Sequence, residues 1–433
     1  MNLLTANDVA GKYPPSYYAD VSHQLEAFAP AVGALKCDVC VVGGGYTGLS
    51  SALHLAQKGY DVILLDAQRI GFGASGRNGG QVGQGQRLDQ DELEPLMGKE
   101  RARGLWDIAT QSVDLVRELA KSDLVECEFH DGIIHADHRK RYVRHSLDYA
   151  KKLQDEYGYD KIRGLERDEV RELIGSDAYY GGTLDLGAGH INPLAFAFGL
   201  ARMAVAAGVR IFEQSEVTGL QQTLPAVVTT DKAQIDAEYV VLACNGYLGD
   251  LNKKVASIVM PINNYIVATE PLPVEQREAL IRHNYAVADS KFVVNYFRFS
   301  DEGRMLFGGT ESYGYRFPQN IADKVRKPMG VIFPQLKHVK IDYAWGGTLG
   351  ITMNRMPHFE RLAGNVLSLS GYSGHGVAMA TLAGKIAAEV IAGQAERFDL
   401  MAEVPNQRFP GGAALRTPLL ALAMLYYSLR DKL

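Results

Sequence analysis

The feature that most constrains this chain is a glycine-rich stretch between two apolar segments. Gly43-x-Gly45-x-x-Gly48 follows the apolar run Cys37 to Val42 and precedes small and apolar residues at helical spacing from Leu49 to Lys58. Tyr60 to Leu65 then predicts a second strand, which ends at Asp66. A lone glycine motif carries little weight in a chain with 45 glycines. The complete order of strand, glycine turn, helix, strand and acid predicts a dinucleotide-binding βαβ unit.

Each part of this unit has a physical function. Gly43 permits a tight turn, Gly45 lets the backbone approach a pyrophosphate, and Gly48 lets the helix pack closely on the strand. The helix N-terminus supplies N–H groups and the positive end of its dipole. Asp66 would accept hydrogen bonds from the adenosine ribose, although a solvated acid at a strand end is the alternative. NAD and FAD share this fingerprint, so the rest of the chain must distinguish them.

A second glycine-rich stretch, Gly71 to Val82, follows directly after the second predicted strand. Its backbone amides and the side chains of Ser75, Arg77 and Asn78 could reach the diphosphate and the ring system of an extended cofactor. Taken alone, the same stretch is equally consistent with an ordinary surface loop.

Later segments continue the nucleotide-binding unit after a long interruption. Asn192-Pro193 caps and opens an apolar helix that ends at Gly208. Strands are predicted near Val209 to Gln214 and from Tyr239 to Cys244. A cofactor domain assembled from separated segments favours FAD over a simple NAD module.

Near the C-terminus the chain repeats the order of strand, glycine loop and helix. Val366 to Ser370 predicts a strand, Gly371 to Gly376 a loop, and Val377 to Ile391 a helix. The N-terminus of that helix would point at the cofactor and could stabilise negative charge on a reduced flavin. A plain structural turn is the alternative.

Composition and charge exclude several classes of protein. The chain has 433 residues, 47% hydrophobic and 22% charged, as expected of a folded protein with room for two or three domains. A net charge of -5 gives no general attraction to nucleic acid. The N-terminus has no pattern typical of a secretory signal, so a cytoplasmic location is expected. The apolar run Leu419 to Tyr427 is too short to span a bilayer and predicts a short docked helix, with a membrane or partner contact as the alternative.

The pair Cys37-x-x-Cys40 is not expected to be a redox or zinc motif. Residues three apart on a strand are expected to point to opposite faces. No second Cys/His pair follows at zinc spacing.

Together these segments resemble the D-amino-acid oxidase (DAO) superfamily of FAD-dependent amine oxidoreductases. The resemblance rests on six stretches of sequence: Tyr13–Tyr18, Asp38–Leu49, Gly73–Gln81, Ala243–Tyr247, Ser370–Gly376 and Arg416–Asp431. Within the superfamily, the chain most resembles the branch that oxidises γ-glutamylputrescine.

The resemblance implies an α/β composite in which a Rossmann-like FAD-binding domain is interleaved with a substrate domain built on a mostly antiparallel sheet. The FAD-binding domain would comprise residues 1–86, 188–255 and 345–433. The substrate domain would comprise residues 87–187 and 256–344. Independently, Phe292 to Phe299 and Arg304 to Gly308 flank turn residues and predict a hairpin.

Noncovalent FAD is the cofactor that the resemblance implies. Arg77 stands where some relatives carry a flavin-linked histidine, and the stretch Trp345 to Ile351 is not followed by the cysteine that others use. Asn354 replaces an aspartate that is common in relatives. The implied cofactor-binding residues are Gly43, Gly45, Tyr46, Thr47, Gly48, Asp66, Ala67, Gly73, Ala74, Ser75, Arg77, Asn78, Gly79, Gly80, Gln81, Val217, Cys244, Asn245, Gly246, Trp345, Gly347, Gly374, His375 and Gly376.

The implied reaction is oxidation of an amine. A hydride passes from the amine-bearing carbon to flavin N5, and water hydrolyses the resulting imine to an aldehyde or keto acid. The implied substrate is γ-glutamylputrescine or a related γ-glutamylated polyamine, with an N-methyl or D-amino acid as the alternative. Either O₂ or another acceptor would reoxidise the flavin.

Four residues are candidates for the substrate site. His375, in the last glycine loop, could help to keep the amine neutral or assist the reduction of oxygen, or could be an ordinary loop histidine bonded to the backbone. Tyr296 and Arg298 share one face of the predicted hairpin, and Arg298 could bind a substrate carboxylate or be an ordinary solvated or salt-bridged residue. Tyr265 is a weaker candidate for the pocket wall.

Three other functions compete with this interpretation. An NAD-dependent dehydrogenase would leave the late glycine loop unexplained. A flavoprotein of tRNA modification is disfavoured by a pI near 6.1 and by the lack of a basic stripe. A flavin-carrying subunit that needs a partner for activity is the third.

Overall fold

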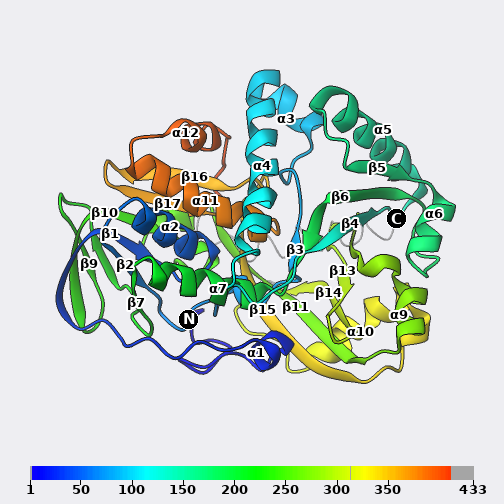
Figure 1. The fold of residues 1–433 in the computed structure, drawn as a ribbon, viewed down its shortest axis with the longest axis horizontal. Coiled ribbons are helices and arrows are strands. Elements are labelled where there is room, and N and C mark those ends of the chain that lie inside the picture. Colours follow the sequence, from blue (N-terminus) through cyan, green and yellow to red (C-terminus); the bar gives the residue numbers. More distant parts are fainter. Residues whose placement is uncertain (1, 313, 411–433) are drawn as a thin grey trace.

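The computed structural model describes residues 2–312 and 314–410. The predicted C-terminal helix at Leu419 to Tyr427 lies outside these residues. Two β-sheets with helices packed against them make up the described chain, and the polypeptide passes back and forth between them (Figure 1). The expected α/β composite is therefore confirmed.

The first sheet has eight strands, of which β16-β17-β10-β1-β2-β7 form one continuous series. Its parallel part consists of β1 (Gly33–Val42), β2 (Val62–Leu65), β7 (Arg210–Phe212), β10 (Ala233–Leu242) and β17 (Val366–Ser370). Antiparallel additions are β8 (Gly219–Gln221), β9 (Ala226–Thr229) and β16 (His358–Ala363). The later strands thus join the first βαβ unit, as the sequence predicts.

Helices cover one face of this sheet (Figure 1). They are α2 (Tyr46–Gln57), α4 (Lys99–Leu119), α7 (Pro193–Ala206) and α11 (Gly376–Ile391). Val39 and Val41 of β1 pack with these helices, whereas Cys40 and Val42 pack toward the β8–β9 hairpin on the other face. Burial on both faces explains why β1 reads as a nearly continuous apolar run.

The two cysteines of β1 correct one expectation. Cys37 and Cys40 both lie in the hydrophobic cluster on the hairpin face, and both are buried free thiols. They share a face because the strand is irregular at Asp38, where the N–H groups of Asp38 and Val39 both donate to the carbonyl of Asp61. Side chains of β1 therefore do not alternate strictly, and the expectation that Cys37 and Cys40 point to opposite faces was wrong. Within the described residues, no group of three or more potential ligands could hold a metal ion.

The second sheet has nine strands in the order β15-β11-β14-β13-β12-β4-β6-β3, with β5 paired to β6. All of its pairs are antiparallel except β12 with β4. The predicted hairpin is confirmed as β13 and β14. The strands are β3 (Gln81–Val82), β4 (His130–Ala136), β5 (Ile162–Leu165), β6 (Gly182–His190), β11 (Met260–Pro271), β12 (Ala286–Asp289), β13 (Tyr296–Phe299), β14 (Arg304–Ser312) and β15 (Ile341–Ile351).

The remaining helices surround these sheets. Apolar residues of α6, α9 and α10 share a core with the second sheet, and α5 packs beside α4 and β5. None of the helices in the described chain is long and apolar enough to cross a membrane. The helices are α1 (Tyr17–Val21), α3 (Gln90–Met97), α5 (Lys140–Tyr157), α6 (Arg167–Leu173), α8 (Lys253–Ala256), α9 (Val274–Leu280), α10 (Ile321–Ile332) and α12 (Glu396–Ala402).

Gly384 of α11 lies where this helix packs against α2. A Cβ at this position would overlap the carbonyl of Thr47 and lie 2.6 Å from the Cβ of Ser50, so α2 and α11 depend on a glycine to approach so closely. We expect Gly384→Ala to lower the unfolding free energy by roughly 1–3 kcal/mol despite the higher helix propensity of alanine. Thermal unfolding of this variant is compared with that of Gly364→Ala, where a Cβ meets nothing within 4 Å. Equal stability of the two variants would contradict the packing.

Candidate cofactor and active site

The predicted nucleotide-binding segments meet at one edge of the first sheet. They follow the carboxyl ends of β1, β2, β10 and β17, which are parallel strands. Ligands of open α/β sheets bind outside this edge. Direct contacts join the loops: the carboxylate of Asp66 accepts from the N–H of Gly44, and the side-chain oxygen of Asn245 accepts from the N–H of Gly371.

The turn after β1 has room only for glycine. Gly43 has φ +111°, and a Cβ there would lie 2.7 Å from the carbonyl oxygen of Ala243, at the end of β10. A Cβ at Gly48 would overlap the carbonyl oxygen of Gly43. The predicted role of these glycines in a tight turn and in close helix–strand packing agrees with this geometry.

The N-terminus of α2 offers donors at this turn. The helix begins at Tyr46, whose N–H donates to the Oγ of Ser75 over 3.0 Å. Within the described residues, the N–H groups of Thr47 and Gly48 have no acceptor. Gly45 precedes them, and a Cβ there would lie 2.9 Å from the Oγ of Ser75. Free N–H groups at the positive end of a helix form an anion site.

Asp66 ends β2 beside this turn. Its two carboxylate oxygens accept from the N–H groups of Gly44 and Gln68, each over 2.7 Å. Burial raises the pKa of Asp66 to about 6, and those two hydrogen bonds oppose the rise. Each carboxylate oxygen keeps a lone pair for a further donor such as a ribose hydroxyl.

The loop after β17 brings a second helix to the same edge. Tyr372 and Thr47 share a hydrogen bond of 2.6 Å between their hydroxyl groups, which ties this loop to α2. α11 begins at Gly376, with His375 as its N-cap residue. A Cβ at Gly374 would meet no atom of the described residues within 4 Å, so these residues leave space beside this loop.

The glycine-rich loop from Gly71 to Val82 spans the two sheets. The N–H of Gly71 donates to the carbonyl of Gly44, whereas Gln81 lies in β3 of the second sheet and donates its side-chain amide to Val287. Asn78 bonds the carbonyls of Ala74 and Ser75 and accepts from the N–H of Gly80. The amide of Asn78 therefore shapes the loop and does not reach out to a cofactor, which corrects the prediction for this side chain.

Arg77 is also turned inward. Its guanidinium is buried, forms an ion pair of 3.0 Å with Asp8, and donates to the carbonyls of Phe72 and Gly346. Its own carbonyl accepts from the indole of Trp345, which is buried as well. Most of the Arg77 guanidinium is thus engaged by the protein, and its Nη2 is buried without a partner among the described residues. The contact of this side chain with the diphosphate stays a prediction, and the indole of Trp345 supports the loop.

The other predicted cofactor residues lie around these loops. Gly73 and Ala74 lie in the glycine-rich loop near the ring of Tyr247, and Gly347 packs against Arg77 from β15. Val217 and Cys244 pack against the cluster on the hairpin face, and Ala67 directly follows Asp66. Gly246 packs against the backbone of Leu349.

Arg298 does not have the predicted role. Its side chain is 4% exposed and donates to the carbonyls of Gly79, Ile191 and Phe299 and to the hydroxyl of Tyr18. A guanidinium engaged in this way has little capacity left for a substrate carboxylate. Arg298 instead fastens the glycine-rich loop to β13, a role that differs from both alternatives considered from the sequence.

The two candidate tyrosines, Tyr265 and Tyr296, lie in different environments. Tyr265 is fully buried in the core of the second sheet, where its hydroxyl bonds to Ser312 and its ring packs against Phe317. Its expected place in the pocket wall is therefore wrong. Tyr296 is partly exposed, donates to Asn264, and places its ring beside Gly79 of the glycine-rich loop. Tyr296 thus remains a candidate for the substrate site.

His375 lies near two titratable residues, Arg87 and His135, that sequence reasoning missed. Burial, with the charges of Arg87 and His135 added, lowers the pKa of His375 well below its ordinary value. Its imidazole is therefore neutral at physiological pH. Its Nδ1 is buried without a partner among the described residues, and its Nε2 lies beside Gly83. Arg87 follows the glycine-rich loop by a few residues, but no motif in the sequence marks it.

His135, Tyr296 and His375 are accessible side chains that are nevertheless strongly desolvated. His135 is exposed, yet burial is the main cause that lowers its pKa. Tyr296 and His375 likewise combine partial exposure with strong desolvation. The three side chains come from both sheets, on β4, on β13 and at the start of α11, and combine accessibility with desolvation. We infer that they line a recessed region between the sheets, the enclosed site.

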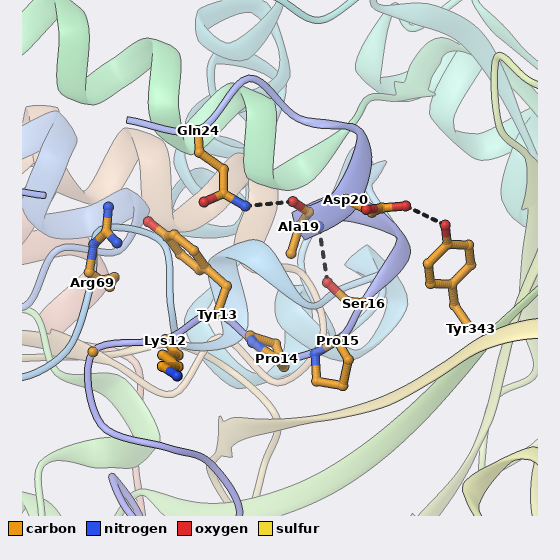
Figure 2. Close-up of a pocket in the computed structure, with 11 residues that line it drawn as sticks. Lys12, Tyr13, Pro14, Pro15, Ser16, Ala19, Asp20, Gln24, Arg69 and Tyr343 are labelled. Atoms are coloured by element: carbon orange, nitrogen blue, oxygen red, sulfur yellow. Dashed lines mark hydrogen bonds between the residues drawn. The ribbon is translucent and has the colours of Figure 1, made fainter. Parts of the chain in front are cut away.

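A separate pocket of about 420 Å³ lies along the N-terminal segment (Figure 2). Its polar side chains are mostly paired: Gln24 donates to Ala19, Tyr343 donates to Asp20, and Arg69 is bound to the buried Glu213. None of the predicted cofactor or catalytic residues lines it. We assign it no chemistry.

Comparison with known proteins agrees with this geometry. Residues 38–390 match the family model DAO, described as FAD dependent oxidoreductase. The chain is 42% identical over 423 residues to gamma-glutamylputrescine oxidoreductase of Escherichia coli, covering 98% of this chain and 99% of that one. It is 40% identical to a probable oxidoreductase OrdL of Rhizobium meliloti, covering 96% and 97%.

Among solved structures, glycine oxidase from Geobacillus kaustophilus shares the fold with a TM-score of 0.72 at 20% identity, covering 86% of this chain and 99% of that one. L-proline dehydrogenase from P. horikoshii gives a TM-score of 0.69 at 20% identity, covering 90% and 99%. The match to the family model spans most of the chain, and the similarity to the two bacterial relatives extends over nearly its full length. The chain therefore belongs to the DAO family of FAD-dependent oxidoreductases.

Proposed function

We propose that this FAD-dependent amine oxidoreductase acts on γ-glutamylputrescine or a related γ-glutamylated polyamine. The observation that carries the proposal is the 42% identity, over 98% of the chain, to the E. coli enzyme named for that substrate. Such a substrate has a primary amine on an apolar four-carbon stem and an amino acid at its far end. It therefore calls for an enclosed site with at least one charged group.

The residues at the edge of the first sheet fit a noncovalent FAD. The turn after β1 excludes a Cβ, and the N–H groups of Thr47 and Gly48 have no acceptor in the described chain, so a diphosphate has both space and donors. Asp66 would accept from the ribose. Arg77, where a flavin-linked histidine occurs in some relatives, is held by Asp8 and offers no covalent attachment.

The domain division expected from the sequence belongs to the same proposal. All strands of the first sheet fall within residues 1–86, 188–255 and 345–433. Most strands of the second sheet fall within residues 87–187 and 256–344, while β3, the end of β6 and much of β15 cross those limits. The enclosed site would then lie between an FAD-binding domain and a substrate domain.

The chain's own residues position the substrate and keep water away. Bound FAD would supply the hydride acceptor. His375 would help to keep the amine neutral, the form that can lose a hydride, because it adds no positive charge beside the amine and can accept a hydrogen bond from it. Tyr296 would form part of the wall beside the glycine-rich loop. O₂ or another acceptor would receive the electrons. A cytoplasmic location fits the four free cysteines.

Asp66 is expected to make the affinity for FAD depend on pH. Its pKa of about 6 means that it is ionised at pH 7.5 and largely protonated at pH 5. A carboxylate binds ribose hydroxyls better than a carboxyl group does, so FAD affinity of the wild-type apoprotein should fall as the pH decreases through 6. We expect Asp66→Asn to bind FAD roughly 10-fold more weakly at pH 7.5 and to lose this pH dependence.

Fluorescence titration of the deflavinated protein with FAD measures both effects. Asp160→Asn, a change at an exposed acid, serves as the matched control and should behave as the wild type. An Asp66→Asn variant that keeps the wild-type affinity and pH dependence would remove Asp66 from the cofactor site.

The substrate is tested by anaerobic visible absorbance of the purified protein. γ-Glutamylputrescine should bleach the flavin band, whereas putrescine, sarcosine and D-alanine should bleach it far more slowly. Faster bleaching by sarcosine or D-alanine would move the enzyme to the N-methyl or D-amino-acid branch. Flavin that none of the four compounds reduces would contradict the proposed substrate.

A further inference from the structure

Arg87 lies between β3 and α3, and its charge has no direct partner in the described part of the chain. Its Nε is buried without an acceptor, and its side chain forms neither an ion pair nor a hydrogen bond with any described residue. The side-chain oxygens of Gln84 and Gln86, in the same segment, are also buried without a donor. Buried polar groups of proteins are nearly always hydrogen-bonded. This segment therefore has binding capacity that the described chain does not use.

The other deep arginines at this site are already engaged. Arg298 makes four hydrogen bonds to the protein, and Arg77 is paired with Asp8. Arg87 is only partly exposed, and burial lowers its pKa to about 10, so it stays charged at neutral pH. Burying a charge without a partner is costly, because its lost hydration is not replaced. A negatively charged ligand would offset that cost.

The segment that carries Arg87 lies against the start of α11. Gly83 lies beside the Nε2 of His375, and the side-chain amide of Gln86 donates to the carbonyl of Leu105 and to the sulfur of Met379 on α11. The charge of Arg87 acts on both His375, at the start of α11, and His135, on β4.

Arg355 adds a second positive charge close enough to act on Arg87, and the acids that oppose it are Asp89 and Glu311. Asp89 caps the N-terminus of α3 and pairs with His145. Glu311 also has an interaction elsewhere, so neither acid is reserved for Arg87.

We propose that Arg87 binds a carboxylate of the substrate and makes the enzyme select amines that carry a carboxylate over free diamines. This inference rests on the proposed function, because it assigns the residue that recognises the amino-acid end of a γ-glutamyl amine. It replaces Arg298 in the role that the sequence had predicted for that residue.

The charges of Arg87 and of the substrate account for the expected preference for a γ-glutamylated amine over a free diamine. A guanidinium can hold a carboxylate through two parallel hydrogen bonds, which fixes orientation as well as charge. A free diamine has an ammonium in place of the amino-acid end, and this cation would meet Arg87 and Arg355 without compensation. The site would therefore favour the γ-glutamylated amine by attraction and disfavour the free diamine by repulsion.

Binding of an unreactive probe tests this inference separately from turnover. The probe is γ-glutamyl-n-butylamide, which has the amino-acid end and the four-carbon stem but no terminal amine to oxidise. A second probe lacks only the α-carboxylate. Calorimetry with the oxidised holoenzyme should show Arg87→Gln weakening the first probe roughly 10- to 100-fold, with the second probe changed less than about 2-fold. Arg87→Lys should fall between, because lysine keeps the charge but loses the planar fork.

Arg144→Gln, at an exposed arginine of α5, is the matched control and should bind both probes as the wild type does. Equal weakening of both probes by Arg87→Gln, or no weakening of either, would overturn the assignment. If Arg87→Gln fails to retain FAD, Arg87→Lys decides: an unchanged affinity for the carboxylate probe contradicts the inference. If the probe binds through Arg87 but γ-glutamylputrescine does not bleach the flavin, the proposed substrate fails while the carboxylate site stands.

Discussion

The close approach of backbone to backbone at the glycine turn is the constraint on which the rest of the structure depends. Gly43 touches the end of β10, and Gly48 packs against the carbonyl of Gly43, so the turn, the helix and the neighbouring strand fit only without side chains. Backbones pack equally closely at Gly384, where α11 lies against α2 and leaves no room for a Cβ. Two helices consequently begin at one sheet edge, and their N-termini face the same region.

The elements of the fold were predictable because each has a local signature. Glycine spacing, apolar strands and an Asn-Pro helix start located β1, α2, α7, β7, β17 and α11 to within a few residues, whereas β10 begins at Ala233, six residues before its predicted start. Parallel pairing then brings their loops together without further information, since the carboxyl ends of parallel strands share an edge. The irregularity at Asp38 was not predictable, because it depends on a backbone contact with the distant Asp61.

Side-chain roles were much harder to predict, and the arginines show why. Arg77 and Arg298 occupy suggestive positions in the sequence, yet both are used to hold the glycine-rich loop in place. Arg87 lies outside every motif, and its lack of a partner among residues 2–312 and 314–410 appears only once the neighbouring elements are placed. Residue type and strand alternation indicate which face a side chain is on. They do not indicate whether its hydrogen-bonding groups are already engaged by the protein.

We expect the turn between β1 and α2 to hold the diphosphate of the FAD. The most direct measurement is the flavin-to-protein ratio of purified Gly45→Val beside that of Gly364→Val. Among the described atoms, a Cβ at Gly45 meets only the movable side chain of Ser75, so the variant can fold, whereas a Cβ at Gly364 meets none of them within 4 Å. We expect Gly45→Val to fold as a colourless protein and Gly364→Val to retain one FAD per chain. Stoichiometric flavin in Gly45→Val would contradict this assignment.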